Sequence, residues 1–454
     1  MNWIGKLLFC FSFISLFSAA ENAVKMPGPV FAKATPGTQA SEPLVLSLPK
    51  GQQEQKEEIS NNPLVLTPRL DSGVNAQPAR HSSEGATAGS KDSSAKSRHC
   101  NVRVLLQEFD TAASAISFKM ESSHGFYLID LKEKKRTSYD AKVLVIKYEK
   151  KKFYLNNALL DKQSFYIKPK EGHFKFDGKS YQGSFLILAD KQSVYVINCL
   201  DIEDYVCCVL RTESWPGWPL EVNKALAICS RSYVIGVVLN QITSKLPYHI
   251  KNTNRHQTYA GVHNDPILKQ AVEQTKGIYL TYDGKPIVAM FDACCGGVIP
   301  SLIQGVNFAH APYLARNYAC RFCTNARGYN WHAVHSFKQL EKMLQSEFPK
   351  VKDIIEVKNY KVDKAGVVQS IQIKTTQHTF HIPTKKMYYL LPKVRSFYFD
   401  TETKKGKVVF TGHGIGHHLG LCQWGAREMV AQGYTYKQIL DFYYPGTKFM
   451  RLSD

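Results

Sequence analysis

Apolar and polar positions follow two different patterns along the chain. Between residues 101 and 198, short runs of β-branched and aromatic residues are separated by turn pairs such as Asp177-Gly178. This pattern predicts strands joined by tight turns. After residue 199, apolar residues recur at helical spacing in several stretches, with further short strands between them. We therefore predict an α+β fold, in which a β-rich N-terminal half is followed by a mixed helix and strand body.

Two predicted helices flank one short turn in the second half. They cover residues 202–211 and 219–240. Pro219 suits the first turn of the second helix, because its missing N–H costs nothing there. Further elements are predicted as helices near residues 266–275, 336–346 and 422–432, and as strands near 278–282, 287–292, 354–362, 367–375 and 408–411.

The turn between these two helices carries the candidate chemistry. Its acidic residue, Glu213, stands close to Trp215 and Trp218. Lys224 and Arg231 are seven residues apart on the following helix, so both cations fall near one face. A carboxyl set against aromatic surface, with cations nearby, can serve as a general acid or base. Glu213 is therefore the candidate catalytic residue.

The chain is strongly basic. Its 454 residues include 58 Lys and Arg against 38 Asp and Glu, which gives a net charge of +20. Such a charge favours polyanionic partners. No stretch resembles a nucleic-acid-binding fold and the lysines are dispersed, so we expect no nucleic acid partner. The charge suits a negatively charged cell wall or membrane surface.

The first residues of the chain predict export. A short basic start precedes an apolar run from Leu7 to Phe17, and the small residues at 18–20 are typical of a signal-peptide cleavage site. We predict a signal peptide at residues 1–20, with an uncleaved membrane anchor as the alternative. Residues 21–99 are rich in Pro, Ser, Gly and charge and predict a disordered linker. The mature protein is expected in the periplasm or cell envelope.

The cysteines leave both disulfides and a metal site open. Eleven are present, and ten remain if Cys10 is removed with the signal peptide. An even number in an exported protein permits disulfides. Cys320-x-x-Cys323, with His332 nearby, has the spacing of a zinc-binding pair, and a local disulfide is equally compatible. The sequence indicates no other cofactor.

A glycine-rich loop near the C-terminus contains His413, His417 and His418. Glycines allow a ligand to approach the backbone closely. The loop has no carboxylate and no His-Glu-x-x-His helix, so a metal site is not favoured there. We expect a loop that contacts saccharide or supports the structure.

An ordered series of motifs runs through the second half of the chain. They are Glu213-x-x-Pro-x-Trp-Pro-Leu-Glu221, Lys224-Ala, Ser230-Arg231-Ser-Tyr233, Gln257-x-Tyr-x-Gly261, Gly296-Gly297, Gly414-x-Gly-His417, Gly420-x-x-Gln423-Trp-Gly-Ala426 and Tyr443-Tyr-Pro-Gly-Thr447. Together they resemble the stage II sporulation protein D (SpoIID) family, which is related to the LytB amidase enhancers. The resemblance spans about residues 100–450. It divides them into a β-rich part at 100–198 and a catalytic region at 199–454.

The resemblance implies a peptidoglycan lytic transglycosylase that acts on glycan strands stripped of stem peptides, in cell-wall remodelling or division. Glu213 matches the family's catalytic glutamate and would be the sole general acid and base. It would protonate the oxygen between N-acetylmuramic acid and N-acetylglucosamine, and then take the proton from the C6 hydroxyl as a 1,6-anhydro ring closes. No water attacks, so the paired carboxylates of ordinary glycosidases are not required. The alternative is a non-catalytic glycan-binding activator of a cell-wall amidase.

The resemblance also implies substrate-binding residues. Arg231 matches a family arginine and is expected to position the substrate. The other expected substrate contacts are Trp215, Trp218, Lys224, His417, Gln423, Gly296 and Gly297.

The chain departs from the family pattern at several of these motifs. Asp292-Ala-Cys-Cys-Gly-Gly297 stands where the family commonly has His-Ser-Thr-Ser-Gly-Gly. Cys422 replaces a serine, and His418 replaces a glycine. Residues 249–256 lack the cysteines with which some relatives bind zinc, so that site is expected to be lost.

Overall fold

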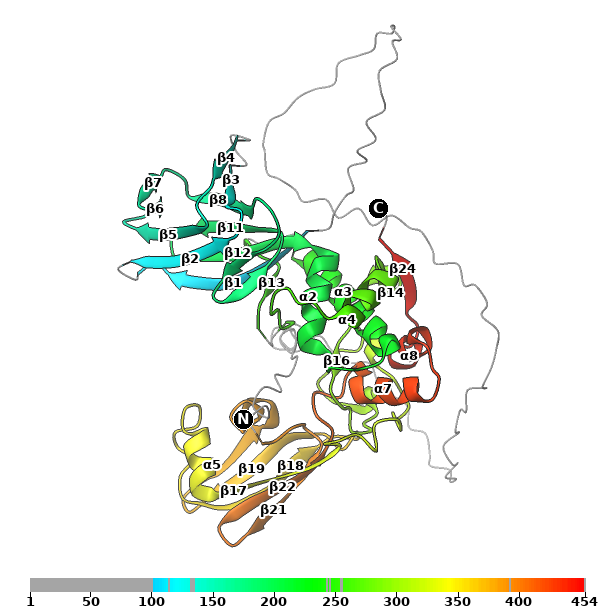
Figure 1. Cartoon of the computed structure of the whole chain (residues 1–454). Helices are drawn as coiled ribbons and strands as arrows, with labels where there is room; N and C mark the ends of the chain where they lie inside the picture. Colours follow the sequence, from blue (N-terminus) through cyan, green and yellow to red (C-terminus); the bar gives the residue numbers. More distant parts are fainter. Residues whose placement is uncertain are drawn as a thin grey trace, which may run out of the picture.

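The computed structural model describes residues 101–112, 115–130, 135–241, 244, 246–253, 256–391 and 393–452. The predicted signal peptide at 1–20 and the predicted linker at 21–99 lie outside the described residues. Helices and several separate sheets alternate along the described chain, which confirms the predicted α+β class (Figure 1).

The N-terminal part is built from two sheets. Its strands follow the alternation expected when one face of a sheet is buried: in β2, Ile116, Phe118 and Met120 are buried and the residues between them are exposed. The larger sheet has the order β13 (Ile250–Lys251), β1 (Asn101–Asp110), β12 (Ser193–Asp201), β11 (Ser184–Ala189), β8 (Ser164–Pro169), β3 (Phe126–Asp130), β4 (Lys135–Tyr139). The smaller has the order β10 (Lys179–Tyr181), β9 (Phe174–Phe176), β2 (Ile116–Ser122), β5 (Val143–Glu149), β6 (Lys152–Leu155), β7 (Ala158–Leu160).

A group of helices follows, with α3 (Leu220–Asn240) at its centre. This helix packs against α2 (Ile202–Glu213), α4 (Pro266–Gln274), α7 (Gln423–Ala431) and α8 (Tyr436–Tyr443), and against strand β14 (Ile278–Tyr282). Among the described residues, α3 is long and apolar enough to cross a membrane, but 83% of its most apolar window is buried inside the fold. It is the core helix of this part of the molecule.

Strands β16 (Phe291–Asp292) and β23 (Leu421–Cys422) are short and pair with each other in parallel. The part of the chain that connects them includes a separate lobe. We call residues 330–413 the insertion lobe. In Figure 1 it appears in yellow and orange, apart from the N-terminal sheets. Its elements are the sheet β17 (Asn330–Ser336), β22 (Lys407–His413), β21 (Phe399–Lys404), the sheet β18 (Ile354–Val362), β19 (Val368–Thr375), β20 (Thr379–Pro383), and the helices α5 (Phe337–Leu344) and α6 (Thr384–Tyr388).

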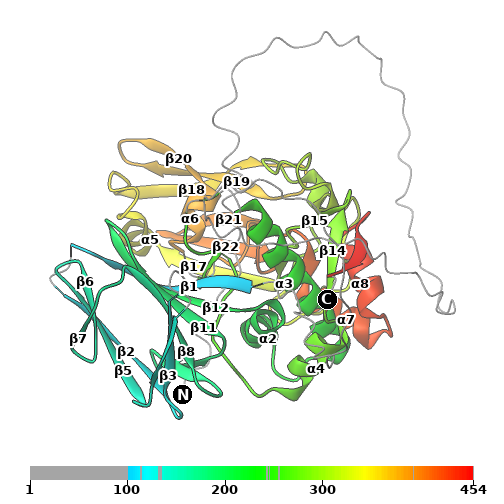
Figure 2. The same ribbon diagram turned by 90° about the horizontal axis from the view of Figure 1, so that it is seen from above.

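The chain ends beside the helices. Strand β24 (Lys448–Arg451) pairs with β14, whose other neighbour is β15 (Lys285–Pro286). Figure 2 shows the same elements from above, where the insertion lobe and the N-terminal sheets overlap in the view. The N-terminal sheets contact the central helices through β1, β12 and β13, and α2 of these helices ends at the candidate catalytic residue.

Candidate active site

Glu213 is the last residue of α2 and is only 7% exposed. The backbone N–H of Thr258 donates to its carboxylate, with 3.1 Å between N and Oε1. The side-chain amide of Gln423 donates to its backbone carbonyl, with 2.7 Å between Nε2 and O. The last carbonyls of a helix have no partner within the helix, so Gln423 satisfies one of them. The structure thus brings together segments that lie 45 and 210 residues from Glu213 along the chain.

The turn after Glu213 is held by Asn223, a buried residue of α3 that we did not single out from the sequence. The hydroxyl of Ser214 lies 2.5 Å from the Asn223 amide oxygen. The amide nitrogen of Asn223 donates to the carbonyls of Trp218 and Pro219, at 3.0 and 3.1 Å. Both ends of the Asn223 side chain therefore bond the turn. An asparagine among the apolar positions at the start of a helix was the available sequence signal.

Three tryptophans pack together beside this turn. The rings of Trp215 and Trp218 stack with centroids 6.2 Å apart, and both contact Trp424 of α7. Trp218 is buried, whereas Trp215 is 36% exposed. Trp424 is partly exposed, so Trp215 is the most exposed member of the cluster, and aromatic faces of this kind line many ligand sites.

Arg231 does not lie where the sequence analysis expected it. The side chain is fully buried, and its guanidinium donates to both carboxylate oxygens of Glu203, at 2.9 and 2.5 Å. It also donates to the carbonyl of Ile278, at 2.9 Å. The same Glu203 carboxylate accepts the N–H of Gly277. Arg231 thus ties α2, α3 and β14 together and has no surface with which to contact a glycan.

Lys224 is also engaged in the structure. Its ammonium lies 2.6 Å from a carboxylate oxygen of Glu221 and 5.7 Å from the ring centroid of Tyr436. The other oxygen of Glu221 accepts the backbone N–H of Tyr436 at the start of α8. Lys224 therefore joins α3 to α8, and the expected substrate contact of this residue stays a prediction.

The histidine loop is mostly enclosed. His417 is 4% exposed, and burial lowers its pKa to about 3, so it is a neutral residue. His418 has a left-handed backbone with φ of +69°, which explains why a glycine suits this position. Its N–H donates to the buried Asp292 carboxylate at 2.7 Å, and its Nδ1 lies 2.8 Å from the carbonyl of Cys295. Of the two expected roles for this loop, these contacts favour a structural one.

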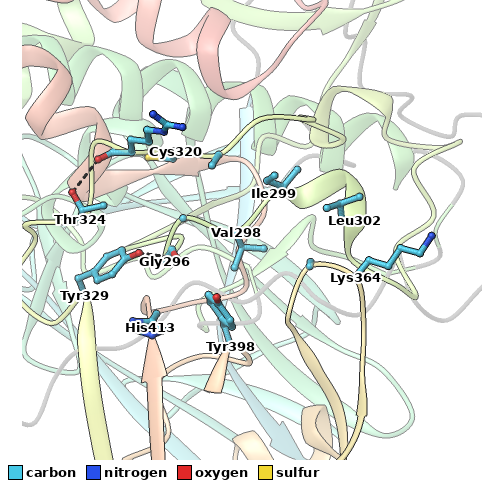
Figure 3. A pocket seen from close by; sticks show the side chains of 14 residues that line it. Gly296, Val298, Ile299, Leu302, Cys320, Thr324, Tyr329, Lys364, Tyr398 and His413 are labelled. Atoms are coloured by element: carbon cyan, nitrogen blue, oxygen red, sulfur yellow. Dashed lines mark hydrogen bonds between the residues drawn. The ribbon is translucent and has the colours of Figure 1, made fainter. Parts of the chain in front are cut away.

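Gly296 and Gly297 line a hollow of about 390 Å³ between the central body and the insertion lobe (Figure 3). Both glycines have positive φ, +64° and +78°, and a side chain on Gly296 would lie 3.0 Å from the backbone of His413. The hydroxyl of Tyr329 donates to the Gly296 carbonyl at 3.1 Å. The rest of the wall includes aromatic and cationic side chains: Tyr329, Tyr398, His413, Arg321 and Lys364. Glu213 is not part of this wall, so the site predicted as one unit divides between two places.

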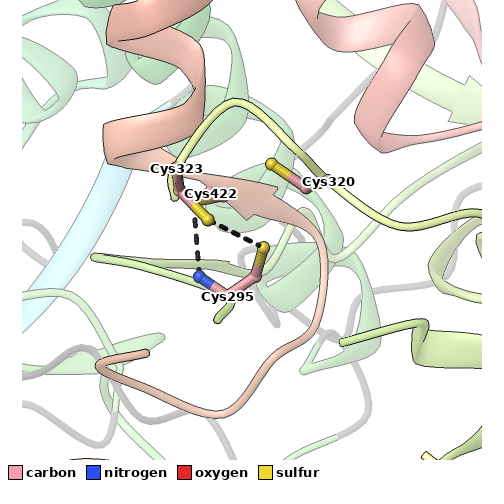
Figure 4. A group of neighbouring side chains, drawn as sticks. All are labelled: Cys295, Cys320, Cys323 and Cys422. Atoms are coloured by element: carbon pink, nitrogen blue, oxygen red, sulfur yellow. Dashed lines mark hydrogen bonds between the residues drawn. The ribbon is translucent and has the colours of Figure 1, made fainter. Parts of the chain in front are cut away.

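Four buried cysteines form a group near Gly296 (Figure 4). The sulfur atoms of Cys295, Cys320, Cys323 and Cys422 all lie within 4.8 Å of one another. From the sequence, only Cys320 and Cys323 were expected to form a metal-binding or disulfide pair. All nine described cysteines are unpaired, and this group is the one that could hold a metal ion.

The sequence matches two families of known proteins. The family described as stage II sporulation protein matches residues 190–282, which run from the end of the N-terminal sheets through α2 and α3 to β14. A domain of unknown function, DUF8618, matches residues 317–420, which include the whole insertion lobe.

Individual relatives extend these matches. An uncharacterized protein of Brachyspira hyodysenteriae is 32% identical over 294 residues, which cover 64% of this chain and 78% of that protein. The amidase enhancer of Bacillus subtilis is 26% identical over 398 residues, 75% of this chain, although the match spans only 53% of that protein. The stage II sporulation protein D of Bacillus subtilis is 23% identical, over 55% of this chain and 74% of that protein.

Proposed function

The chain belongs to the stage II sporulation protein D family, and we propose that it is an exported peptidoglycan lytic transglycosylase with Glu213 as its sole general acid and base. The observation that carries the proposal is the placement of Glu213. It ends a helix beside a half-exposed tryptophan and is held by the Thr258 backbone and by Gln423. Glu213, Thr258 and Gln423 belong to three different motifs of the ordered series.

The surroundings of Glu213 suit a group that both gives and takes a proton. Its burial and its place at the C-terminal end of α2, where the helix carries partial negative charge, favour the neutral acid. The N–H of Thr258 favours the carboxylate. A general acid that later acts as a base holds both protonation states in turn, and each of these contacts stabilises one of them.

The reaction needs one carboxyl. The Glu213 acid gives its proton to the glycosidic oxygen as the bond from that oxygen to C1 of N-acetylmuramic acid breaks. The resulting carboxylate takes the proton of the C6 hydroxyl of the same sugar as O6 bonds to C1. The products are a new 4-hydroxyl on N-acetylglucosamine and a 1,6-anhydro end, and Glu213 is again protonated.

The other glutamates of α2 and α3 each bond a cation: Glu203 bonds Arg231, and Glu221 bonds Lys224. Neither is therefore a free carboxylate of the kind that activates water in inverting glycosidases. The single-carboxyl reaction needs no such residue.

The proposed substrate is a peptidoglycan strand without stem peptides. Trp215 offers an aromatic face to a sugar ring beside Glu213, and the net charge of +20 favours an anionic wall polymer. Export to the periplasm or cell envelope follows from the predicted signal peptide.

The test compares the mature protein with its Glu213→Gln variant on purified denuded strands. We expect Glu213→Gln to bind strands as the wild type does and to release 10²–10⁴-fold less product, roughly the contribution of a general acid and base. Gln keeps the shape of Glu but cannot transfer the proton, and circular dichroism checks that the variant is folded. Equal product from the variant would refute the assignment of Glu213.

A second candidate function is supported by the relative named amidase enhancer. In this reading the chain binds glycan and activates a cell-wall amidase without cleaving the strand. Adding the Glu213→Gln protein to a purified cell-wall amidase distinguishes the two functions. Full stimulation of the amidase together with no strand cleavage by the wild type would favour the activator.

A further inference from the structure

We infer that Cys295, Cys320, Cys323 and Cys422 together bind one zinc ion. Structural zinc sites are closed tetrahedra, often of four cysteines, and a pair spaced Cys-x-x-Cys is typical of them. Here one such pair, Cys320 and Cys323, is completed by two cysteines from distant parts of the chain. All four side chains are at most 1% exposed.

The spacing of the sulfur atoms fits a single tetrahedral ion. Four thiolates about 2.3 Å from zinc lie about 3.8 Å from one another. The sulfurs of Cys295 and Cys323 are 3.7 Å apart, and all four lie within 4.8 Å of each other. A disulfide brings only two sulfurs together, at about 2.05 Å. Mutual proximity of four sulfurs is the arrangement of a shared ligand set.

The surroundings of the sulfurs also suit thiolate ligands. The sulfur of Cys422 accepts the backbone N–H groups of Cys295 and Gly425, each at 3.3 Å, and outer hydrogen bonds of this kind orient metal ligands. The sulfur of Cys320 lies 3.2 Å from the hydroxyl of Tyr443. A side chain at Gly425 would come within 2.9 Å of the Cys320 sulfur, so the glycine leaves room for the group.

The position of the group gives the ion a structural task. Cys295 follows β16, Cys320 and Cys323 precede the insertion lobe, and Cys422 ends β23 directly after it. The ion would thus fasten both ends of the insertion lobe to the central body. Two of the ligands, Cys295 and Cys422, stand at positions where the family pattern has serine, so these departures have one common explanation.

The same ion would support the candidate active site. Cys422 is the N-cap of α7, and the next residue, Gln423, donates to the Glu213 carbonyl. Trp424 follows and packs on Trp215 and Trp218. Fixing Cys422 therefore fixes the start of the helix that holds Glu213 in place; this consequence for catalysis rests on the proposed function, whereas the metal site does not.

The direct test is the metal content of the purified full-length mature protein, with no metal added during purification. We expect about one zinc ion per chain. After zinc is replaced by Co²⁺, we expect about one cobalt ion per chain, with the visible absorption of a tetrahedral thiolate complex. Cys295→Ser and Cys422→Ser are expected to lower bound zinc at least tenfold. Cys229→Ser is the matched control, since Cys229 is equally buried but lies in α3 and is not one of the four, and this variant should keep its zinc.

Several results would overturn the inference. These are a protein without metal whose four thiols are oxidised to disulfides, a protein that holds iron instead, and equal zinc in the wild type and Cys295→Ser. The wild-type measurement needs no variant, so the inference remains testable if the serine variants fail to fold.

The link to the active site has its own readout. Removing zinc with a chelator is expected to change the fluorescence of the tryptophan cluster and to lower the melting temperature, and adding zinc should reverse both. These changes do not depend on glycan cleavage. An inactive protein that still binds zinc would contradict the proposed function alone, and an active protein without zinc would contradict the metal site alone.

Discussion

Replacing Arg231 tests whether this residue supports the fold or binds substrate. In the structure it is fully buried and makes two bonds to Glu203 and one to the carbonyl of Ile278. Arg231→Met removes the cation and leaves the Glu203 carboxylate with only the N–H of Gly277 among these bonds. Breaking a buried pair in this way costs about 3–5 kcal/mol. The Glu203 side chain is 18% exposed, so we expect the lower end, about 3 kcal/mol.

The assay is urea unfolding of the mature protein followed by circular dichroism. Arg211→Met serves as the control, because Arg211 lies exposed on the last turn of α2, and it should change the unfolding free energy by at most about 0.5 kcal/mol. The double variant Arg231→Met with Glu203→Leu should recover part of the loss, since it removes the unpaired charge as well. Unchanged stability in Arg231→Met, together with weaker strand binding, would refute the structural role and restore the expected substrate contact.

Three further predictions follow from single contacts. Gln423→Leu removes the hydrogen bond to the Glu213 carbonyl and should lower the unfolding free energy by about 0.5–1.5 kcal/mol. A turnover loss larger than the loss of strand affinity would identify Gln423 as a positioning residue, and unchanged turnover would argue against that role. Trp218→Ala should lower the unfolding free energy by about 3–5 kcal/mol, because Trp218 is buried. Trp215→Ala should mainly weaken strand binding, measured in a pull-down assay. A large loss of stability with unchanged strand binding in Trp215→Ala would contradict the assignment of Trp215 to the solvent side. Burial, with a smaller effect of Arg103, lowers the pKa of His249 from 6.5 to about 4. Between these two pH values the unfolded chain therefore binds more protons than the folded chain, so the unfolding free energy should fall as the pH falls from about 6.5 to 4. Urea unfolding across this pH range should show a smaller fall for His249→Gln than for the wild type.

Local patterns predicted the elements around the active site well. The long apolar repeat starting at Pro219 gave a helix at 219–240, and α3 spans Leu220–Asn240. The strand predicted at 278–282 is β14. These elements are decided by spacing and by residues that start or stop a helix, and both are local properties of the sequence.

Other elements were missed or shortened for physical reasons. Helix α8 (Tyr436–Tyr443) has eight residues, too few for a clear repeat, although Thr435 and Gln438 form a capping box that was a readable signal. The strand predicted at 287–292 reduces to Phe291–Asp292, because the two-residue β23 is its only strand partner within the described part of the chain. Such partners come from the tertiary fold and leave no local trace.

The site residues divide in the same way. Glu213 stood out because a lone acid lay among tryptophans, and the motif order connected it with Gln423. Arg231 was assigned to substrate from the family resemblance, and its partner Glu203, 28 residues earlier, could not be recognised from the sequence. Cys295 and Cys422 are 127 residues apart and meet only through the parallel pairing of β16 with β23, so no spacing rule could have joined them to Cys320 and Cys323.

Digestion of denuded glycan strands in ¹⁸O-labelled water, with mass spectrometry of the strand ends, distinguishes ring closure from hydrolysis. With the mature wild-type protein we expect 1,6-anhydro ends without ¹⁸O, because the C6 hydroxyl of the substrate closes the ring, and far fewer such ends with Glu213→Gln. New ¹⁸O-carrying reducing ends, in excess of those in strands incubated without protein, would mean hydrolysis by water. Intact strands after binding would mean that the protein does not cleave, and either result would refute the proposed transglycosylase.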